Sequence, residues 1–327
     1  MIEIKGDFLM NKAILLATLA IVAVAGCTDV QIPQIFQPTT TLLAGTGMVM
    51  TDFSADQTEV FGGQSDRVMM TVSNKGGHSV PDSESLVYLT GSALIESGTA
   101  SPMYWTTSAN LIQKFGKEMK PADSIRDTPA DEKIISWSLV APNISRGEQT
   151  QYLFIGRIYY DYQTKVTGNI WVYSESEADA ARASERTLNT ATWSATSGPV
   201  AVVGRVTQNP VILYGSDNKF TLVIKISNAG GGVLYQKGAI TYSSTNPDDL
   251  KLTTDQINRV TIAGNVAGTS LPAECTGVQE LIGGKDLTLT CDVTITSPAT
   301  FQGFPITITA DYGYFTERST SVTVSGR

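Results

Sequence analysis

Short runs of alternating apolar and polar residues fill most of the chain from about residue 45 onward, separated by glycine, proline, asparagine and aspartate. Alternation with a period of two puts every second side chain on one face, which is the pattern of a half-buried β-strand, and the residues between the runs favour tight turns. The runs predicted as strands in the first half are Val68–Val72, Ser85–Leu89, Ile134–Leu139, Tyr152–Ile155 and Asn169–Tyr173. The sequence therefore predicts an all-β fold.

Two segments depart from this pattern. Residues 99–132 carry three prolines, so we predict an elaborated connection there, with a short helix at 108–115, and it is the first candidate for a binding loop. Residues 174–186 are rich in alanine and glutamate, and Ser174 precedes Glu177 by three positions, which fits a capping box. We predict that this second segment is a short exposed linker helix or a frayed spacer.

The pattern of the first half recurs in the second half, in the same order and at nearly constant spacing. Asn74 of a Ser-Asn-x-Gly-Gly motif is matched by Asn228 at a separation of 154 residues. The motif Tyr160-Asp-Tyr162 is matched by Tyr312-Gly-Tyr314 at 152, and the run 134–142 is matched by 290–298 at 156. Repeats of this length indicate two copies of one β-domain. Each pair of tyrosines shares one strand face, where it would cover a sandwich edge and bond outward through its hydroxyls.

These motifs resemble those of the tandem immunoglobulin-like modules, of the CARDB or related kind, found in archaeal and bacterial surface proteins. The resemblance covers nearly all of residues 45–327 and implies a cell-surface adhesion or scaffold role. The predicted fold is all-β, with two tandem antiparallel immunoglobulin-like β-sandwiches after an N-terminal signal and lipid-anchor segment. The predicted divisions are a signal peptide at 1–26, a tether at 27–44, a first sandwich at 45–174, a linker at 175–197 and a second sandwich at 198–327.

An apolar run at Ala13–Ala25, preceded by Lys12, leads directly to Gly26 and Cys27. It is about thirteen residues long, whereas a membrane-spanning helix needs roughly twenty, and small residues before a cysteine suit peptidase cleavage. This stretch resembles the prokaryotic lipoprotein signal, found in bacteria and many archaea, which implies a diacylglyceryl group on Cys27. An uncleaved N-terminal anchor is the alternative, and Met10 is a candidate start. Both interpretations place the bulk of the chain outside the cytoplasm.

The chain has three cysteines, an odd number for an exported protein. With Cys27 assigned to lipid, Cys275 and Cys291 remain as one pair. Cys291 shares a strand face with Leu289 and Val293 and therefore points into a core. A disulfide across this 16-residue separation would stabilise the fold by about 3 kcal/mol in an oxidising compartment. Two buried free thiols are the alternative.

Charge and candidate chemistry narrow the function further. Charged residues make up only 17% of the chain and the net charge is −8, so the surface repels phosphate backbones and we expect no nucleic-acid partner. His78 is the single histidine and follows two glycines, so we interpret it as a solvated turn residue. The acidic pairs Asp82/Glu84 and Asp248/Asp249 match no calcium-loop spacing and are interpreted as solvated charge, with a weak interdomain calcium site left open. We predict no catalytic residue, cofactor or metal ligand.

Three residues remain as candidates for modification or binding. Asn143 begins an Asn-Ile-Ser tripeptide in a predicted loop and is a possible glycosylation acceptor if the host glycosylates exported proteins. Tyr104 and Trp105 are candidate ligand contacts that would stack on a sugar, although aromatic residues of a sandwich more often belong to its core or edge. Trp137 alternates with apolar residues and is predicted to be a core residue.

We therefore predict an exported, lipid-anchored structural or adhesive protein on the extracytoplasmic face of the cell envelope, without enzymatic activity. Its expected partners are the membrane, through lipid on Cys27, and other surface proteins or glycans. One alternative is a solute- or glycan-binding surface lipoprotein. Another is a filament-forming subunit in which the tether adds to a neighbour's sheet edge by strand exchange.

Overall fold

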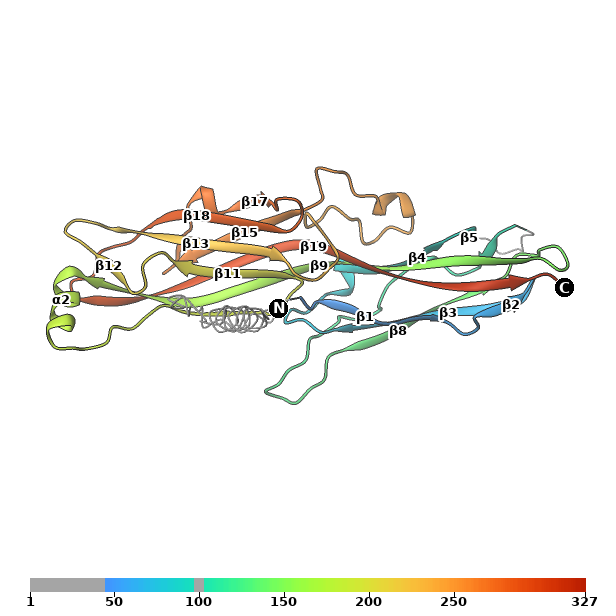
Figure 1. The fold of residues 1–327 in the computed structure, drawn as a ribbon, viewed down its shortest axis with the longest axis horizontal. Coiled ribbons are helices and arrows are strands. Elements are labelled where there is room, and N and C mark those ends of the chain that lie inside the picture. Colours follow the sequence, from blue (N-terminus) through green and yellow to red (C-terminus); the bar gives the residue numbers. More distant parts are fainter. Residues whose placement is uncertain (1–44, 97–102) are drawn as a thin grey trace, which may run out of the picture. The chain divides into compact units, whose positions relative to one another are not determined.

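Nearly all regular structure in the computed structural model is β-strand, as the alternating pattern predicted (Figure 1). The model describes residues 45–96 and 103–327, so the predicted signal peptide, Cys27 and the tether lie outside the described residues. The strands of the first half are β1 (Met48–Ala55), β2 (Glu59–Phe61), β3 (Ser65–Asn74), β4 (Ser85–Gly91), β5 (Leu94–Glu96), β6 (Trp105–Thr107), β7 (Ile112–Gln113), β8 (Glu132–Val140) and β9 (Gln149–Ser174).

The second half follows a helix, α2 (Glu175–Ala183), and repeats the same plan. Its strands are β10 (Thr192–Ala195), β11 (Val200–Val206), β12 (Val211–Leu213), β13 (Lys219–Asn228), β14 (Val233–Tyr235), β15 (Arg259–Val266), β16 (Thr269–Ser270), β17 (Gly277–Glu280), β18 (Asp286–Thr294) and β19 (Phe301–Ser325). Short 3-10 turns are formed by Asp82–Glu84, Pro247–Leu250 and Ala273–Cys275.

The strands form two matching sheets and one shared sheet. In the first half β1, β3 and β8 are neighbours in a sheet that continues to β6 and β5, and in the second half β11, β13 and β18 form the equivalent sheet. The shared sheet has the order β16-β15-β19-β9-β4-β7, with β2, β10, β12, β14 and β17 attached to it. Corresponding strands occupy corresponding places, since β2 pairs in parallel with the end of β19 and β12 pairs in parallel with the end of β9.

The two longest strands, β9 and β19, run antiparallel and connect the halves. Every residue of the 25-residue β19 pairs with a residue of β9. Along both strands most even-numbered side chains point inward, and those of Phe154, Ile158, Ile170, Ile308 and Val322 are fully buried. β4 pairs with the beginning of β9, and β15 pairs with the beginning of β19. Each long strand therefore begins in the sandwich of its own half and ends in the sandwich of the other.

This exchange was not expected from the sequence, which predicted one sandwich from each half. Residues Tyr152–Ile155 and Asn169–Tyr173, predicted as separate strands, are two parts of β9. The second part pairs with β10 and β12, which belong to the second half. The described residues all fall in one compact unit. The boundaries at 174 and 198 thus mark the sequence repeat, and whether they mark separate folding units stays a prediction.

The two predicted helices had different outcomes. The helix at the linker is confirmed as α2, and the Ser174 hydroxyl accepts a hydrogen bond from the Glu177 backbone N–H, which is one half of a capping box, while the Ser174 N–H donates to the Thr300 carbonyl instead of the Glu177 side chain. The helix predicted at 108–115 is wrong, because Ile112–Gln113 is strand β7, paired with β4. Phe115 is fully buried in the extended segment that follows. Burial of apolar residues along an extended chain outweighed local helix propensity here.

The disulfide between Cys275 and Cys291 is present, with the two Cα atoms 6.0 Å apart. Cys275 lies in a 3-10 turn and Cys291 lies on β18 with its side chain in the core, 3% exposed. The bridge fastens this turn to the sheet of the second half. Trp137 is also buried in the core, as its alternation with apolar neighbours predicted.

Candidate functional site

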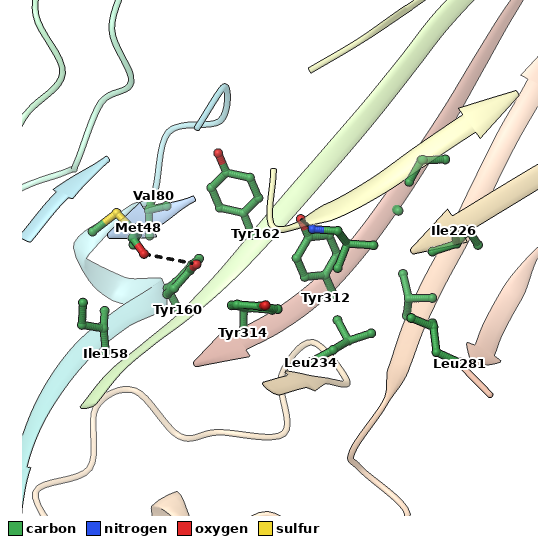
Figure 2. Close-up of a cluster of buried hydrophobic side chains, with 14 of the residues drawn as sticks. Met48, Val80, Ile158, Tyr160, Tyr162, Ile226, Leu234, Leu281, Tyr312 and Tyr314 are labelled. Carbon is green, nitrogen blue, oxygen red and sulfur yellow. Dashed lines mark hydrogen bonds between the residues drawn. The ribbon is translucent and has the colours of Figure 1, made fainter. Parts of the chain in front are cut away.

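The repeated tyrosines meet at the centre of the β9–β19 ladder. Tyr160 pairs with Tyr314, and Tyr162 pairs with Tyr312, so each tyrosine of one half lies opposite a tyrosine of the other (Figure 2). All four are buried, with ring centroids 5.9 Å apart in the first pair and 6.1 Å apart in the second. The prediction that they share a strand face is confirmed, but their hydroxyls bond inward instead of outward.

These hydroxyls bind the turns that contain the repeated asparagines. The Tyr162 hydroxyl accepts a hydrogen bond from the His78 backbone N–H at 3.0 Å, and the Tyr314 hydroxyl accepts one from the Gly232 N–H at 2.7 Å. The Asn74 side-chain amide donates to the His78 carbonyl at 2.8 Å, and Asn228 donates to the Gly232 carbonyl at 3.1 Å. Each asparagine motif is thus a turn fastened to a central tyrosine.

Burial keeps these phenols neutral. Loss of hydration raises the pKa of Tyr162 and of Tyr314 to about 12, and it raises the pKa of Tyr160 and Tyr312 as well. A neutral hydroxyl can both donate and accept a hydrogen bond. The Tyr162 hydroxyl does both, since it also donates to the Ser197 carbonyl at 3.3 Å. The cluster is therefore a structural junction of neutral donors and acceptors.

A second polar group lies on the opposite face of the same ladder, around Asp161. This side chain is 4% exposed and pairs across the ladder with Gly313, over which the ring of Tyr235 packs. The Tyr242 hydroxyl donates to Asp161 Oδ1 at 2.7 Å and shares a 2.8 Å hydrogen bond with the Tyr235 hydroxyl. Burial raises the pKa of Asp161 to about 6, although the Tyr242 hydrogen bond and the Lys237 ammonium favour the carboxylate.

Lys237, near Asp161, forms ion pairs with carboxylates from both halves of the chain. Its Nζ lies 3.8 Å from Glu84 Oε2 on the first half and 3.9 Å from Asp311 Oδ1 on β19. The Lys114 Nζ donates to the backbone carbonyls of Asp82 and Ser85 at 2.7 and 2.8 Å. Glu84 therefore connects the two halves through an ion pair, whereas Asp82 holds residues 114–116 within the first half, through its carbonyl and through its carboxylate, which accepts a hydrogen bond from the Gly116 N–H at 2.8 Å.

A groove opens beside the tyrosine cluster, on the side of β1. Its volume is about 700 Å³. Glycine-containing turns at 45–47 and 230–232, the first residues of β1 and residues 314–318 of β19 line it. Three charged residues are among those that line the groove: Arg157 and Glu317, which form an ion pair at 2.9 Å, and Arg318.

The candidate ligand contacts Tyr104 and Trp105 differ in exposure. Trp105 is fully buried and packs edge-on against Phe154 and Tyr152, with ring centroids 5.2 and 6.0 Å away. It is a core residue, because its position on β6 turns it inward, and it cannot contact a ligand in this structure. Tyr104 is 40% exposed, so a two-residue aromatic platform does not form.

The remaining candidates lie apart from the junction, except for His78. Asn143 is exposed in a loop, where a glycosylation acceptor would have to be. His78 is half-buried, not fully solvated, and its ring packs edge-on against Tyr162 at 5.3 Å, while burial lowers its pKa. Asp248 pairs with Lys251 at 2.7 Å, and Asp249 accepts a hydrogen bond from Ser244.

The described part of the chain offers neither a metal-binding cluster nor a membrane-spanning helix. In residues 45–96 and 103–327, no three or more His, Cys, Asp or Glu side chains are placed to hold a metal ion. The same part of the chain contains no helix with the length and apolar character that a membrane crossing needs.

No protein-family model matches the sequence, and no curated protein matches it. Among solved structures, the chain is similar to red sea bream transglutaminase at 10% identity and a TM-score of 0.19, covering 84% of this chain and 31% of that one. It is similar to the D0-D1 domain of intimin at 11% identity and TM-score 0.18, covering 84% and 98%. The SafA pilin of Salmonella enterica in complex with the SafB chaperone matches at 12% identity and TM-score 0.18, covering 76% and 86%. The chain thus spans about a third of the transglutaminase, and TM-scores this low carry no argument about function.

Sequence reasoning found the tyrosine motifs but missed Asp161 and its partners. Tyr235 and Tyr242 are 74 and 81 residues away from Asp161 in the sequence, so no local pattern connects them. One signal was available in Ile158-Tyr-Tyr-Asp-Tyr162, a nearly continuous apolar run. Such a run indicates a strand buried on both faces, and a carboxylate within it needs a buried partner.

Proposed function

We propose that this protein is an exported, lipid-anchored structural or adhesive element of the cell surface, without catalytic activity. The observation that carries the proposal is the uninterrupted ladder of β9 and β19 through both sandwiches. Two sandwiches joined by a flexible linker would bend freely, whereas two paired strands with a buried junction hold them as one body. Such a body suits a spacer that presents loops or strand edges at a fixed distance from a membrane.

The cellular location rests on separate features. The apolar run before Cys27 has the form of a lipoprotein signal, and the Cys275–Cys291 disulfide is a bond that persists in oxidising, extracytoplasmic compartments. The weakly charged surface, with 17% charged residues, is typical of exported β-proteins. The partners proposed are the membrane, through the lipid, and other surface proteins or glycans.

Rigidity is tested by spin labels at opposite ends of the ladder. Arg146 and Ser184 are exposed residues, one before β9 and one after α2. With Arg146→Cys and Ser184→Cys labelled in a chain carrying Cys27→Ser, pulsed EPR should give one narrow distance distribution. A control pair within the first half, Arg146→Cys with Arg126→Cys, sets the width contributed by the labels and loops. A distribution much broader than this control would contradict the spacer role.

Anchoring is tested on the mature N-terminus. Expression in a bacterium that processes lipoproteins should give a chain that begins at Cys27, carries a diacylglyceryl mass and sediments with membranes. Cys27→Ser should release the chain from the membrane, whereas the neighbouring Thr28→Ser should leave its distribution unchanged. An unmodified Cys27 on an intact leader would refute the lipid anchor and leave the rigidity result standing.

A further inference from the structure

An aromatic pair lies on the outer face of the β9–β19 ladder, at the end beside α2 (Figure 1). Trp171 lies between the fully buried Ile170 and Val172 on β9, so its side chain points to the opposite, outer face. Its ring centroid is 6.1 Å from that of Phe301, which begins β19 and is 45% exposed. Phe301 in turn stacks on Tyr173, which is 1% exposed, with the centroids 5.7 Å apart. Trp171 and Phe301 therefore form an aromatic platform that Tyr173 supports.

Trp171 differs from the other three tryptophans of the chain. Trp105 and Trp137 are fully buried, and Trp193 packs against the core. Trp171 is half-buried on an outer face and has an exposed aromatic neighbour. Single exposed apolar residues are ordinary, whereas exposed apolar side chains that cluster within a polar rim mark interaction sites.

The first half shows that the fold does not require aromatic residues at these positions. At the offset of 152 between the repeated tyrosine motifs, Thr323 corresponds to Trp171, and Gln149 corresponds to Phe301. Gln149 Nε2 donates to the hydroxyl of Ser325, its partner across the ladder, at 3.1 Å. The same ladder thus ends in polar side chains in one half and in aromatic side chains in the other. The platform is an addition to the repeat, which indicates a role other than folding.

A glycine places an amide group next to the platform. Gly303 pairs with Trp171 across the ladder, and a Cβ at this glycine would lie 2.7 Å from Asn169 Nδ2. The equivalent residues of the first half are Gln151 and Ser321, whose side chains hydrogen-bond to one another at 3.0 Å. Glycine has no side chain to make this bond. The nitrogen and oxygen of the Asn169 amide therefore remain beside Trp171 without the cross-strand partner that the first half provides.

The face that continues from the platform along the ladder is polar and uncharged. Thr167 and Thr307 pair on it, and Thr192 of β10 lies opposite Asn169. Back along this face of β9, the first charged residue is Lys165. Such a surface gives no electrostatic complement to a phosphate or a charged peptide, and it suits an uncharged partner with many hydroxyl groups.

We propose that Trp171, Phe301 and Asn169 form a binding site for a neutral pyranose sugar of a surface glycan. The C–H face of a pyranose packs on an aromatic ring, and its hydroxyls bond the nitrogen and the oxygen of an amide. Aromatic contact area with a few polar groups that fix orientation is the usual composition of a small-ligand site. The site rests on the proposed adhesive role and deepens it by naming the ligand class.

Binding is tested on an array of neutral glycans that contain gluco-, galacto-, manno- and N-acetylhexosamine residues. The probe is the full chain carrying Cys27→Ser, displayed densely on beads so that weak sites act together. The beads should bind at least one of these glycan classes. Trp171→Ala should lower the retained amount about tenfold, because a tryptophan at the centre of a site carries much of the binding energy. Trp171→Phe keeps a ring and should retain more than Trp171→Ala.

Two further substitutions separate recognition from folding. Thr323→Ala changes the equivalent position of the first half and should bind as the unsubstituted chain does. Asn169→Ala removes only the amide and should lower binding about threefold, with an unchanged urea midpoint. Binding to none of the neutral glycans would overturn the proposal, as would binding that survives both Trp171→Ala and Asn169→Ala. Sedimentation that shows a dimer dissociated by Trp171→Ala would assign the platform to a second copy and would also overturn it.

NMR locates the contact with a soluble oligosaccharide from the bound class. The indole N–H signal of Trp171 is identified by its loss in Trp171→Phe, and it should shift on titration, whereas those of the buried Trp105 and Trp137 should not. Shifts confined to other tryptophans would place the sugar elsewhere and contradict the proposal. Failure of either test leaves the spin-label and lipid results as they are, so it is distinct from failure of the proposed function.

Discussion

Tyr162 and Tyr312, which come from equivalent motifs of the two halves, lie directly opposite one another on β9 and β19 with their rings 6.1 Å apart. Both side chains are buried, and each hydroxyl bonds a backbone group that enters a neighbouring turn or strand: His78 N–H for Tyr162, and Val200 N–H at 3.3 Å for Tyr312. The repeated tyrosine motifs are thus also the residues through which the two halves contact one another.

Removing one of these hydroxyls should weaken the fold. Tyr162→Phe leaves the His78 N–H without its partner and removes one of two donors from the Ser197 carbonyl, which keeps the Gly77 N–H, and it should lower the free energy of unfolding by about 1–3 kcal/mol. Tyr314→Phe should cost a similar amount, since its hydroxyl also makes two hydrogen bonds, accepting from the Gly232 N–H and donating to Asn228 Oδ1. Urea unfolding measures both, and Tyr214→Phe, at a residue 48% exposed, should change little. Equal stability of all three variants would show that the hydroxyls of Tyr162 and Tyr314 do not stabilise the fold.

The buried carboxyl of Asp161 should make stability depend on pH. Its pKa is raised from 3.8 to about 6 in the folded state, so the folded chain holds the proton more tightly than the unfolded chain. The free energy of unfolding should therefore fall as pH rises from about 4 to about 6, by up to roughly 3 kcal/mol, and level off above that. Asp161→Asn, which keeps an acceptor for Tyr242, should flatten the profile in this window. An unchanged slope of unfolding free energy against pH in that variant would show that other titratable groups cause the pH dependence.

Reduction of the disulfide should destabilise the second half. The bridge joins residues separated by 16 in the sequence, which corresponds to about 3 kcal/mol in the loop-entropy model. Chemical denaturation with and without a reductant compares the two states without any substitution. Because β18 belongs to a different sheet from β1 and β8, amide exchange should rise first in β18 and the 3-10 turn at Cys275. A uniform rise across both halves would indicate that the bridge acts on the whole unit.

The predicted first domain should not fold alone. In a fragment of residues 45–174, the end of β9 loses β10, β12 and β19, which leaves Val166, Ile170 and Val172 exposed to water. These side chains are at most 1% exposed in the full chain, so their burial is lost with the second half. We expect one calorimetric transition for the full chain and none that is cooperative for the fragment. A fragment that melts sharply would instead support two independent domains.

Alanine substitutions at Trp105 and Tyr104 should differ in their effect on stability, because Trp105 lies in the core and Tyr104 at the surface. Trp105→Ala removes a fully buried ring that contacts Phe154 and Tyr152, and it should cost about 3–5 kcal/mol. Tyr104→Ala, at a residue 40% exposed, should stay within about 0.5 kcal/mol. Thermal and chemical unfolding of both variants measures this contrast. A small effect at Trp105 would mean that the loop around β6 is not part of the core.

The sequence by itself determined the β-class of the fold, the duplication, the capped helix after Ser174 and the pairing of Cys275 with Cys291. Each of these depends on signals within a few residues or on a direct count: alternation along a strand, a cap three residues before a glutamate, and two cysteines that remain for one bridge once Cys27 is predicted to carry lipid. Only the tertiary structure decided that β9 and β19 exchange between sandwiches and that Asp161 is buried beside Tyr242. Alternation fixes which face of a strand is apolar, but the strand that pairs beside it is chosen by contacts between residues far apart in the chain.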